Sequence, residues 1–372
     1  MPFNLRCSVC GQEYDPASLI WRCSCGGLLD LAAFEAYFPL EAIRQRQPTL
    51  WRYREALPFA PDYTGWQQIT MGEGFTPLIP LGAETPGILL KVEYQMPTLS
   101  FKDRGAAVLI AKAQELGIKR VIADSSGNAG TAIAAYAARA GIACDVYVPA
   151  SASAKKLRQM ATHGATVHAV SGSREDTAAA AIAAAEREQV FYASHVYQPV
   201  FFQGTKTYAF ELFEQLGGSA PDALVLPVGN GTLVLGAYYG FKDLLRAGLI
   251  EHMPRFLAVQ AEGCAPLARA FERGEEVAEP VINTGTEAEG IAIAAPARSR
   301  QILAAVRETG GMILTVSDTA IEQARDDLAR RGLYVEPTAA APYAGFVSSA
   351  ERFTTSDERV IIPLCGAGLK AG

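Results

Sequence analysis

Short apolar runs alternate with longer alanine-rich stretches along most of the chain. The apolar runs are rich in β-branched residues and predict strands at 88–92, 120–124, 144–148, 166–170 and 190–193. The stretches between them predict helices at 105–116, 129–140, 154–163 and 175–189, two of which are closed by Gly117 and Gly141. This alternation is typical of βαβ units on a parallel sheet.

A second series of the same kind follows. It predicts helices at 207–216, 233–247, 299–309 and 318–331, and strands at 223–227, 255–260, 312–315 and 359–363. The pattern indicates the α/β class, with two three-layer αβα domains built on parallel sheets. We expect a small module at 1–30, an arm and part of the large domain at 31–104, a small domain at 105–200, and the rest of the large domain at 201–372.

Composition agrees with a two-domain protein of the cytoplasm. A chain of 372 residues is too long for one core, and 49% hydrophobic residues can fill two. The net charge is −6, and Lys and Arg are scattered, so neither a nucleic-acid nor a membrane partner is expected. No apolar signal segment opens the sequence, and the expected location is therefore cytoplasmic.

Four of the seven cysteines lie close together near the N-terminus: Cys7, Cys10, Cys23 and Cys25. A C-x-x-C pair and a C-x-C pair, each followed by glycine, can surround one tetrahedral Zn²⁺. The second pair is one residue shorter than usual, so four reduced thiols on a metal-free turn stay open as the alternative. With only Arg6 and Arg22 as basic residues, the module does not resemble a nucleic-acid-binding ribbon.

Three loops at the mouths of predicted helices carry candidate chemistry. Ser-Phe-Lys-Asp-Arg-Gly at 100–105 places Lys102 where it can be desolvated, as Schiff-base chemistry requires, although a solvated helix start also fits. Ser-Ser-Gly-Asn-Ala-Gly at 125–130 exposes backbone amides at a helix N-terminus, which suits a carboxylate or phosphate. An ordinary capped helix start remains the alternative.

The third loop, Pro-Val-Gly-Asn-Gly-Thr-Leu at 227–233, has successive amides and a hydroxyl that suit a phosphate dianion. It lacks the lysine of a Walker P-loop and the G-x-G-x-x-G spacing, which argues against a nucleotide.

Together the three loops, in this order, resemble the fold-type II pyridoxal-phosphate (PLP) enzymes of the tryptophan synthase β superfamily, most closely the threonine synthase group. Gly-Phe-Thr-Pro-Leu at 74–78 and Leu-Cys-Gly-Ala-Gly-Leu-Lys at 364–370 extend the resemblance, and a zinc-ribbon-like N-terminus also occurs in relatives. The resemblance implies that Lys102 is catalytic and binds PLP covalently. It further implies substrate-carboxylate contacts from Ser125, Ser126 and Gly127, and cofactor contacts from Asn128, Gly229, Asn230, Gly231, Thr232, Leu233 and Cys365.

Two positions depart from the threonine synthase pattern. Ala129 stands where the group usually has threonine, and Phe201 stands where an Asn-Pro-x-Arg element has its arginine. Both changes remove contacts for a substrate phosphate. The best single expectation is threonine synthase, acting on O-phosphohomoserine. A serine/threonine ammonia-lyase and a cysteine- or cysteate-forming β-replacement enzyme remain alternatives.

A non-catalytic PLP-binding module is not favoured, because binding alone does not need a Schiff-base lysine. The expected partners are a small amino-acid substrate and, as an open possibility, a second copy of the chain in a homodimer.

Overall fold

The computed structural model describes residues 3–32, 34–152, 154–352 and 358–370. It divides into two compact units. Unit 1 contains Met1–Gly74 and Lys102–Thr205, and unit 2 contains Phe75–Phe101 and Lys206–Gly372. Both are built around largely parallel sheets, which confirms the α/β class. Among the described residues, no helix has the length and apolar character needed to cross a membrane.

The sheet of unit 1 is parallel, with the order β8-β7-β6-β9. From β6 the chain proceeds to β7 and β8 on one side, and then returns to place β9 on the other side of β6. The order therefore reverses between β6 and β9, and ligands of open α/β sheets bind at such a point, beyond the carboxyl ends of the strands. The strands are β6 (Arg120–Asp124), β7 (Ala143–Pro149), β8 (Thr166–Val170) and β9 (Phe191–Tyr192).

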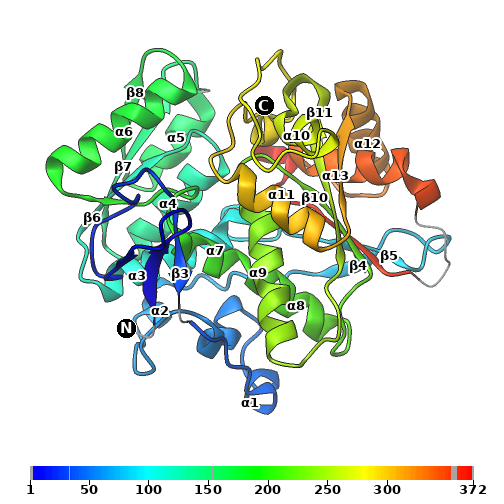
Figure 1. Ribbon diagram of the computed structural model, residues 1–372, viewed down its shortest axis with the longest axis horizontal. Coiled ribbons are helices and arrows are strands. Elements are labelled where there is room, and N and C mark those ends of the chain that lie inside the picture. The colour runs from blue at the N-terminus through cyan, green and yellow to red at the C-terminus, as the bar shows by residue number, and fades with distance from the viewer. Residues whose placement is uncertain (1–2, 33, 153, 353–357, 371–372) are drawn as a thin grey trace. The chain divides into compact units, whose positions relative to one another are not determined.

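Helices cover both faces of this sheet (Figure 1). Val121 of β6 packs in one core with α4, whereas Ile122 packs in another with α6. Because successive side chains of a strand point to opposite faces, α4 and α6 lie on opposite sides of the sheet. The helices of unit 1 around the sheet are α3 (Lys102–Glu115), α4 (Asn128–Arg139), α5 (Ala154–Thr162), α6 (Arg174–Glu188) and α7 (Pro199–Thr205).

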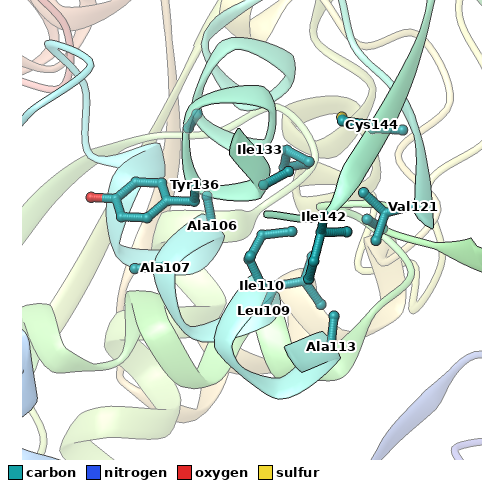
Figure 2. Packing of buried hydrophobic residues seen from close by; sticks show 14 of the residues in the cluster. Ala106, Ala107, Leu109, Ile110, Ala113, Val121, Ile133, Tyr136, Ile142 and Cys144 are labelled. Carbon is teal, nitrogen blue, oxygen red and sulfur yellow. The ribbon is translucent and has the colours of Figure 1, made fainter. Parts of the chain in front are cut away.

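The larger core of unit 1 joins α3, α4 and the sheet. Figure 2 shows Leu109 and Ile110 of α3 directed toward Ile133 of α4 and Val121 of β6, and all four are fully buried. Many alanines on α3 and α4 keep the helix surfaces flat, which lets the helices approach closely. This packing holds the first turns of both helices in fixed positions.

Helix α7, which the sequence pattern did not predict, packs against α3 at two glycines. A Cβ atom at Gly105 would lie 2.2 Å from the Phe201 ring, and one at Gly204 would lie 2.0 Å from the Arg104 carbonyl oxygen. Only glycine fits at such separations. The start of α3 is therefore fixed by close backbone packing.

The N-terminal part of unit 1 is a small antiparallel sheet followed by short helices. Its order is β2-β1-β3, with β1 (Asn4–Cys7), β2 (Glu13–Tyr14) and β3 (Leu29–Ala32). The helices are α1 (Leu40–Arg44), the 3₁₀ helix η1 (Leu50–Ala56) and α2 (Trp66–Ile69). The Trp51 indole N–H donates to the Glu73 carboxylate at 2.7 Å, within the same unit.

Unit 2 has a six-stranded sheet with the order β12-β11-β10-β13-β5-β4. All neighbours are parallel except β4 and β5. The order reverses between β10 and β13, which here is at the centre of the sheet. The strands are β4 (Leu78–Pro80), β5 (Ile88–Lys91), β10 (Ala223–Pro227), β11 (Arg255–Ala261), β12 (Met312–Val316) and β13 (Val360–Pro363).

The main helices of unit 2 are α8 (Thr207–Gln215), α9 (Thr232–Arg246), α10 (Pro266–Glu272), α11 (Ser299–Glu308), α12 (Asp318–Arg330) and α13 (Pro337–Ser348). Short 3₁₀ turns are η2 (Glu262–Cys264), η3 (Glu289–Ile291), η4 (Ala350–Arg352) and η5 (Gly368–Lys370).

Candidate active site

Lys102 is the first residue of α3 and is half-buried. Its Nζ lies 6.0 Å from the centroid of the Phe201 ring, in the same unit. The two residues that follow, Asp103 and Arg104, are 0% exposed. The helix start is therefore not the solvated one that the sequence left open. Lys102 therefore has an apolar neighbour, and its backbone is held in a buried helix start. Such surroundings favour a reactive lysine.

The Ser-Ser-Gly-Asn loop leads from the end of β6 into α4. Gly127 caps the helix with extended backbone, and its amide donates to Ser125 Oγ at 3.3 Å. A Cβ at Gly130 would lie 1.9 Å from the Ser125 carbonyl oxygen, so the loop folds back against the helix only with glycine there. Ser126, Gly127 and Asn128 are half-buried. The loop thus presents a helix N-terminus to a ligand, a favourable position for a carboxylate.

Two further polar residues of unit 1 lie near these elements, and the sequence analysis missed both. His195 follows β9 and is buried, and its burial, together with the charges of Lys102 and Arg174, lowers the pKa of its imidazole well below the ordinary value. Asp124 ends β6 beside the Ser125–Asn128 loop. The signal in the sequence was that each stands at or just beyond the carboxyl end of a predicted strand.

In unit 2, the glycine-rich loop joins β10 to α9. Gly231 is the N-cap of α9 with φ of 78°, a conformation that favours glycine. A Cβ there would lie 2.5 Å from Ile302 Cδ1, and one at Gly229 would lie 2.8 Å from the Gly290 carbonyl oxygen. The backbone is thereby held close to its neighbours, with the first-turn amides of a 15-residue helix directed outward. This arrangement fits a phosphate group.

Cys365 follows β13, the strand next to β10, so it shares a sheet edge with the glycine-rich loop. Its side chain is buried. The Phe101 amide donates to the Cys365 carbonyl oxygen at 3.0 Å, and Ser100 forms an antiparallel bridge with Gly366. Phe101 directly precedes Lys102 in the chain. The segment leading to Lys102 is therefore fixed to the same edge of the unit 2 sheet.

The four N-terminal cysteines are gathered in one cluster. Their Sγ atoms all lie within 4.8 Å of one another, with Cys7 to Cys25 at 3.5 Å and Cys10 to Cys23 at 3.6 Å. A tetrahedral site with Zn–S bonds of about 2.3 Å has sulfurs about 3.8 Å apart, so the cluster fits one zinc ion. A hydrogen bond from the Tyr14 hydroxyl, at 3.0 Å, lowers the pKa of Cys23 to about 6.

Phe201 is fully buried in the core of unit 1. Among basic residues, Arg104 lies on α3, against which α7 packs, and Lys206 directly follows α7. Lys206 is 1% exposed and its Nζ pairs with Asp243 at 2.8 Å, within unit 2. Arg104 is buried completely. Both side chains are thus about as deeply buried as Phe201.

Comparison with known proteins places these features in context. Residues 69–366 match the family described as "Pyridoxal-phosphate dependent enzyme". The chain is 36% identical to the threonine synthase of Methanosarcina acetivorans, over 92% of this chain and 86% of that protein. It is 35% identical to the threonine synthase of Methanocaldococcus jannaschii, over 98% and 92%. Maize serine racemase has the same fold, with a TM-score of 0.69 at 23% identity, over 79% of this chain and 88% of that one.

Proposed function

The chain belongs to the pyridoxal-phosphate-dependent enzyme family and to its threonine-synthase-like group, and on that premise we propose that it is a threonine synthase, converting O-phosphohomoserine to threonine and phosphate. The observation that carries the proposal is identity of 35% over 98% of the chain with a threonine synthase. The alignment spans nearly all of that relative as well, so the likeness extends beyond the cofactor-binding loops.

The residues present fit PLP. Glycine is required at 229 and 231, where a Cβ would meet neighbouring atoms, and the α9 N-terminus suits the phosphate of PLP. We assign that phosphate to residues 229–233, the 3′-oxygen to Asn128, and the pyridine nitrogen to Cys365. When bound, PLP withdraws electrons from the α-carbon of an amino acid and so makes its proton removable.

The chain's own groups would then act in separate roles. The Ser125–Gly127 loop orients the substrate through its α-carboxylate. Lys102 Nζ takes the proton from the α-carbon and returns a proton later in the cycle. The Cys365 thiol is a weak, neutral hydrogen-bond partner, which leaves the pyridine nitrogen largely unprotonated and favours elimination over transamination.

The two departures from the threonine synthase pattern lead to a quantitative prediction. Because Phe201 and Ala129 replace groups that relatives use for the substrate phosphate, we expect weak binding of O-phosphohomoserine. Each lost charge-assisted hydrogen bond costs roughly 1.5–3 kcal/mol, which is about one to two orders of magnitude in affinity. Initial rates of threonine formation across substrate concentrations would measure the KM. A micromolar KM with efficient turnover would show that other groups bind the phosphate.

A second candidate function is elimination from serine or threonine. It is favoured by Phe201, because a phenyl ring at this position supplies neither a charge nor a hydrogen bond for a substrate phosphate, a group that serine and threonine lack. One panel separates the two reactions. Holoenzyme is given O-phosphohomoserine, serine and threonine in turn, and threonine, phosphate and keto acid are assayed. Keto acid from serine or threonine, without threonine from O-phosphohomoserine, would replace the first proposal by the second.

We also propose that Cys7, Cys10, Cys23 and Cys25 bind a structural zinc ion. The compact sulfur cluster supports this, as does the donation of the Val9, Cys10 and Gly27 amides to cysteine sulfurs at 3.4–3.5 Å. Metal analysis should then find about one Zn²⁺ per chain. Chelation should loosen the N-terminus without bleaching the cofactor band.

The Cys10→Ser variant should lose most of this zinc, because three thiolates bind the ion less tightly than four. Cys264→Ser is the control, since Cys264 is a buried cysteine of unit 2 remote in sequence from the cluster. Metal-free wild-type protein with four freely titrating N-terminal thiols would instead support the metal-free turn.

A further inference from the structure

The carboxyl ends of β6 and β9 hold polar side chains to which the proposed function gives no role. The two strands are parallel neighbours, with Ile122 opposite Tyr192. Asp124 and Ser194 follow two residues later and so share the face of Ile122 and Tyr192. Asp124 directly precedes the Ser125–Asn128 loop. The group therefore lies where the strand order reverses, the usual position of a ligand site in this architecture.

The cluster faces α6. Ile122 and Tyr192 pack against Ala181, Ala184 and Ala185 of that helix, so Asp124 and Ser194 also point toward its side of the sheet. The charged and titratable groups around the cluster include Arg174 at the start of α6, Tyr147 opposite Asp124 on β7, and Lys102 of α3, whose charge reaches His195. His195 and Tyr197 follow β9 itself, and the Tyr197 ring lies 6.2 Å from that of Tyr192 between centroids.

Two oxygens in this cluster are poorly satisfied. Asp124 Oδ1 and the Tyr192 hydroxyl are shielded from solvent and have no hydrogen-bond partner with good geometry among the residues that the structure describes. A buried carboxylate oxygen in that state is destabilised when ionised. Burial accordingly raises the pKa of Asp124 to about 6, while the Tyr192 and Ser194 hydroxyls and the charge of Arg174 act in the opposite direction.

We infer that Asp124 takes up a proton when the Ser125–Asn128 loop receives the substrate carboxylate, and that it is thus a positioning residue which couples substrate binding to pH. A second negative charge beside the loop disfavours the ionised form of Asp124. By linkage, protonation of Asp124 raises the affinity for the carboxylate by the same factor by which the bound carboxylate raises the proton affinity of Asp124. The inference rests on the proposed function only in that the anion is the α-carboxylate of an amino acid.

The direction of the pH effect follows from this linkage. Well below its pKa of about 6, Asp124 is already protonated, and affinity for the amino acid is at its maximum. Above that pKa the ionised fraction of Asp124 grows. Binding then requires Asp124 to take up a proton from solvent, which lowers the apparent affinity. If only the protonated form binds, the apparent Kd rises about tenfold by pH 7 and about a hundredfold by pH 8. Asparagine at 124 is a neutral group of the same size and should remove this rise.

The test is binding of L-threonine to holoenzyme, followed through the cofactor absorbance band, at pH 5.5, 7 and 8. The readout is the Kd of the parent divided by the Kd of Asp124→Asn, because ionisation of the ligand and cofactor affects both proteins alike. We expect a ratio near one at pH 5.5, about ten at pH 7 and about one hundred at pH 8. A flat ratio, or weaker binding by the variant at every pH, would overturn the inference.

Two variants of the exposed first turn of α6 refine the assignment. Arg174→Gln removes the cation that favours ionised Asp124, so the midpoint of the parent profile should move to higher pH. Glu175→Gln, at the next position, should change the profile little. An unmoved midpoint in Arg174→Gln would refute titration at Asp124, and this test stands even if Asp124→Asn fails to fold.

The inference and the proposed function fail in different ways. L-Threonine binding needs no turnover. A pH-dependent ratio without threonine formation from O-phosphohomoserine would refute the proposed function alone. Threonine formation with a flat ratio would refute the role of Asp124 alone.

Discussion

Lys102→Ala is expected to abolish turnover and to leave no cofactor label that borohydride reduction can fix to the chain. Two losses combine in this variant. The covalent attachment of PLP disappears, and so does the base that moves the α-proton, a role worth on the order of 10²- to 10⁴-fold in rate by itself. Peptide mapping after reduction, together with a threonine-formation assay, would measure both effects.

Lys119→Ala is the matched control, because Lys119 lies on the surface of the same unit just after α3. It should keep label and activity. The assignment of Lys102 fails if the reduced label is found on another lysine, such as Lys91 or Lys206. Both of these are buried and form ion pairs in unit 2, Lys91 with Glu211 at 2.9 Å and Lys206 with Asp243 at 2.8 Å, so neither is expected to react.

Gly231→Val should weaken retention of PLP by two orders of magnitude or more. A side chain at this position would overlap Ile302, and a β-branched residue resists a φ of 78°, so the first turn of α9 must shift. Hydrogen bonds to a charged phosphate contribute about 1.5–3 kcal/mol each, and displacing two of them has this effect. Equilibrium dialysis, or titration of apoenzyme with PLP, would measure the change.

Gly248→Val controls for backbone strain, since Gly248 lies just beyond the other end of α9 with φ of 68° and open space around its Cβ position. It should lose some stability and keep its affinity for PLP. If Gly231→Val binds PLP as tightly as the parent, the phosphate site lies elsewhere.

Much of unit 1 and unit 2 was predictable because it depends on local pattern. The predicted strands at 120–124, 166–170 and 223–227 coincide with β6, β8 and β10. Each is a short apolar run bounded by turn residues, and such runs are typical of the buried strands of a parallel sheet. The three loops of candidate chemistry also fall at strand-to-helix or helix-start positions, as the sequence indicated.

Helices α7 and α13 are among those that the sequence analysis missed, and in both cases proline misleads a local interpretation. Helix α7 begins at Pro199, and α13 begins at Pro337 and contains Pro342. Proline is tolerated at the first position of a helix and disfavoured inside one. Burial overrides that preference here, since Phe201, Phe202 and the middle of α13 are enclosed by the cores of their units. Only packing between distant segments supplies that stabilisation.

The sequence by itself therefore determined the α/β class, the family, and the residue types at each loop, because these reside in short motifs and in the period of apolar positions. The tertiary structure decided the order of the strands, since β9 joins β6 and β13 joins β10 across long stretches of chain. That order places Cys365 at the same sheet edge as the glycine-rich loop. It also encloses Asp124, because the solvation of a carboxylate depends on which distant side chains surround it.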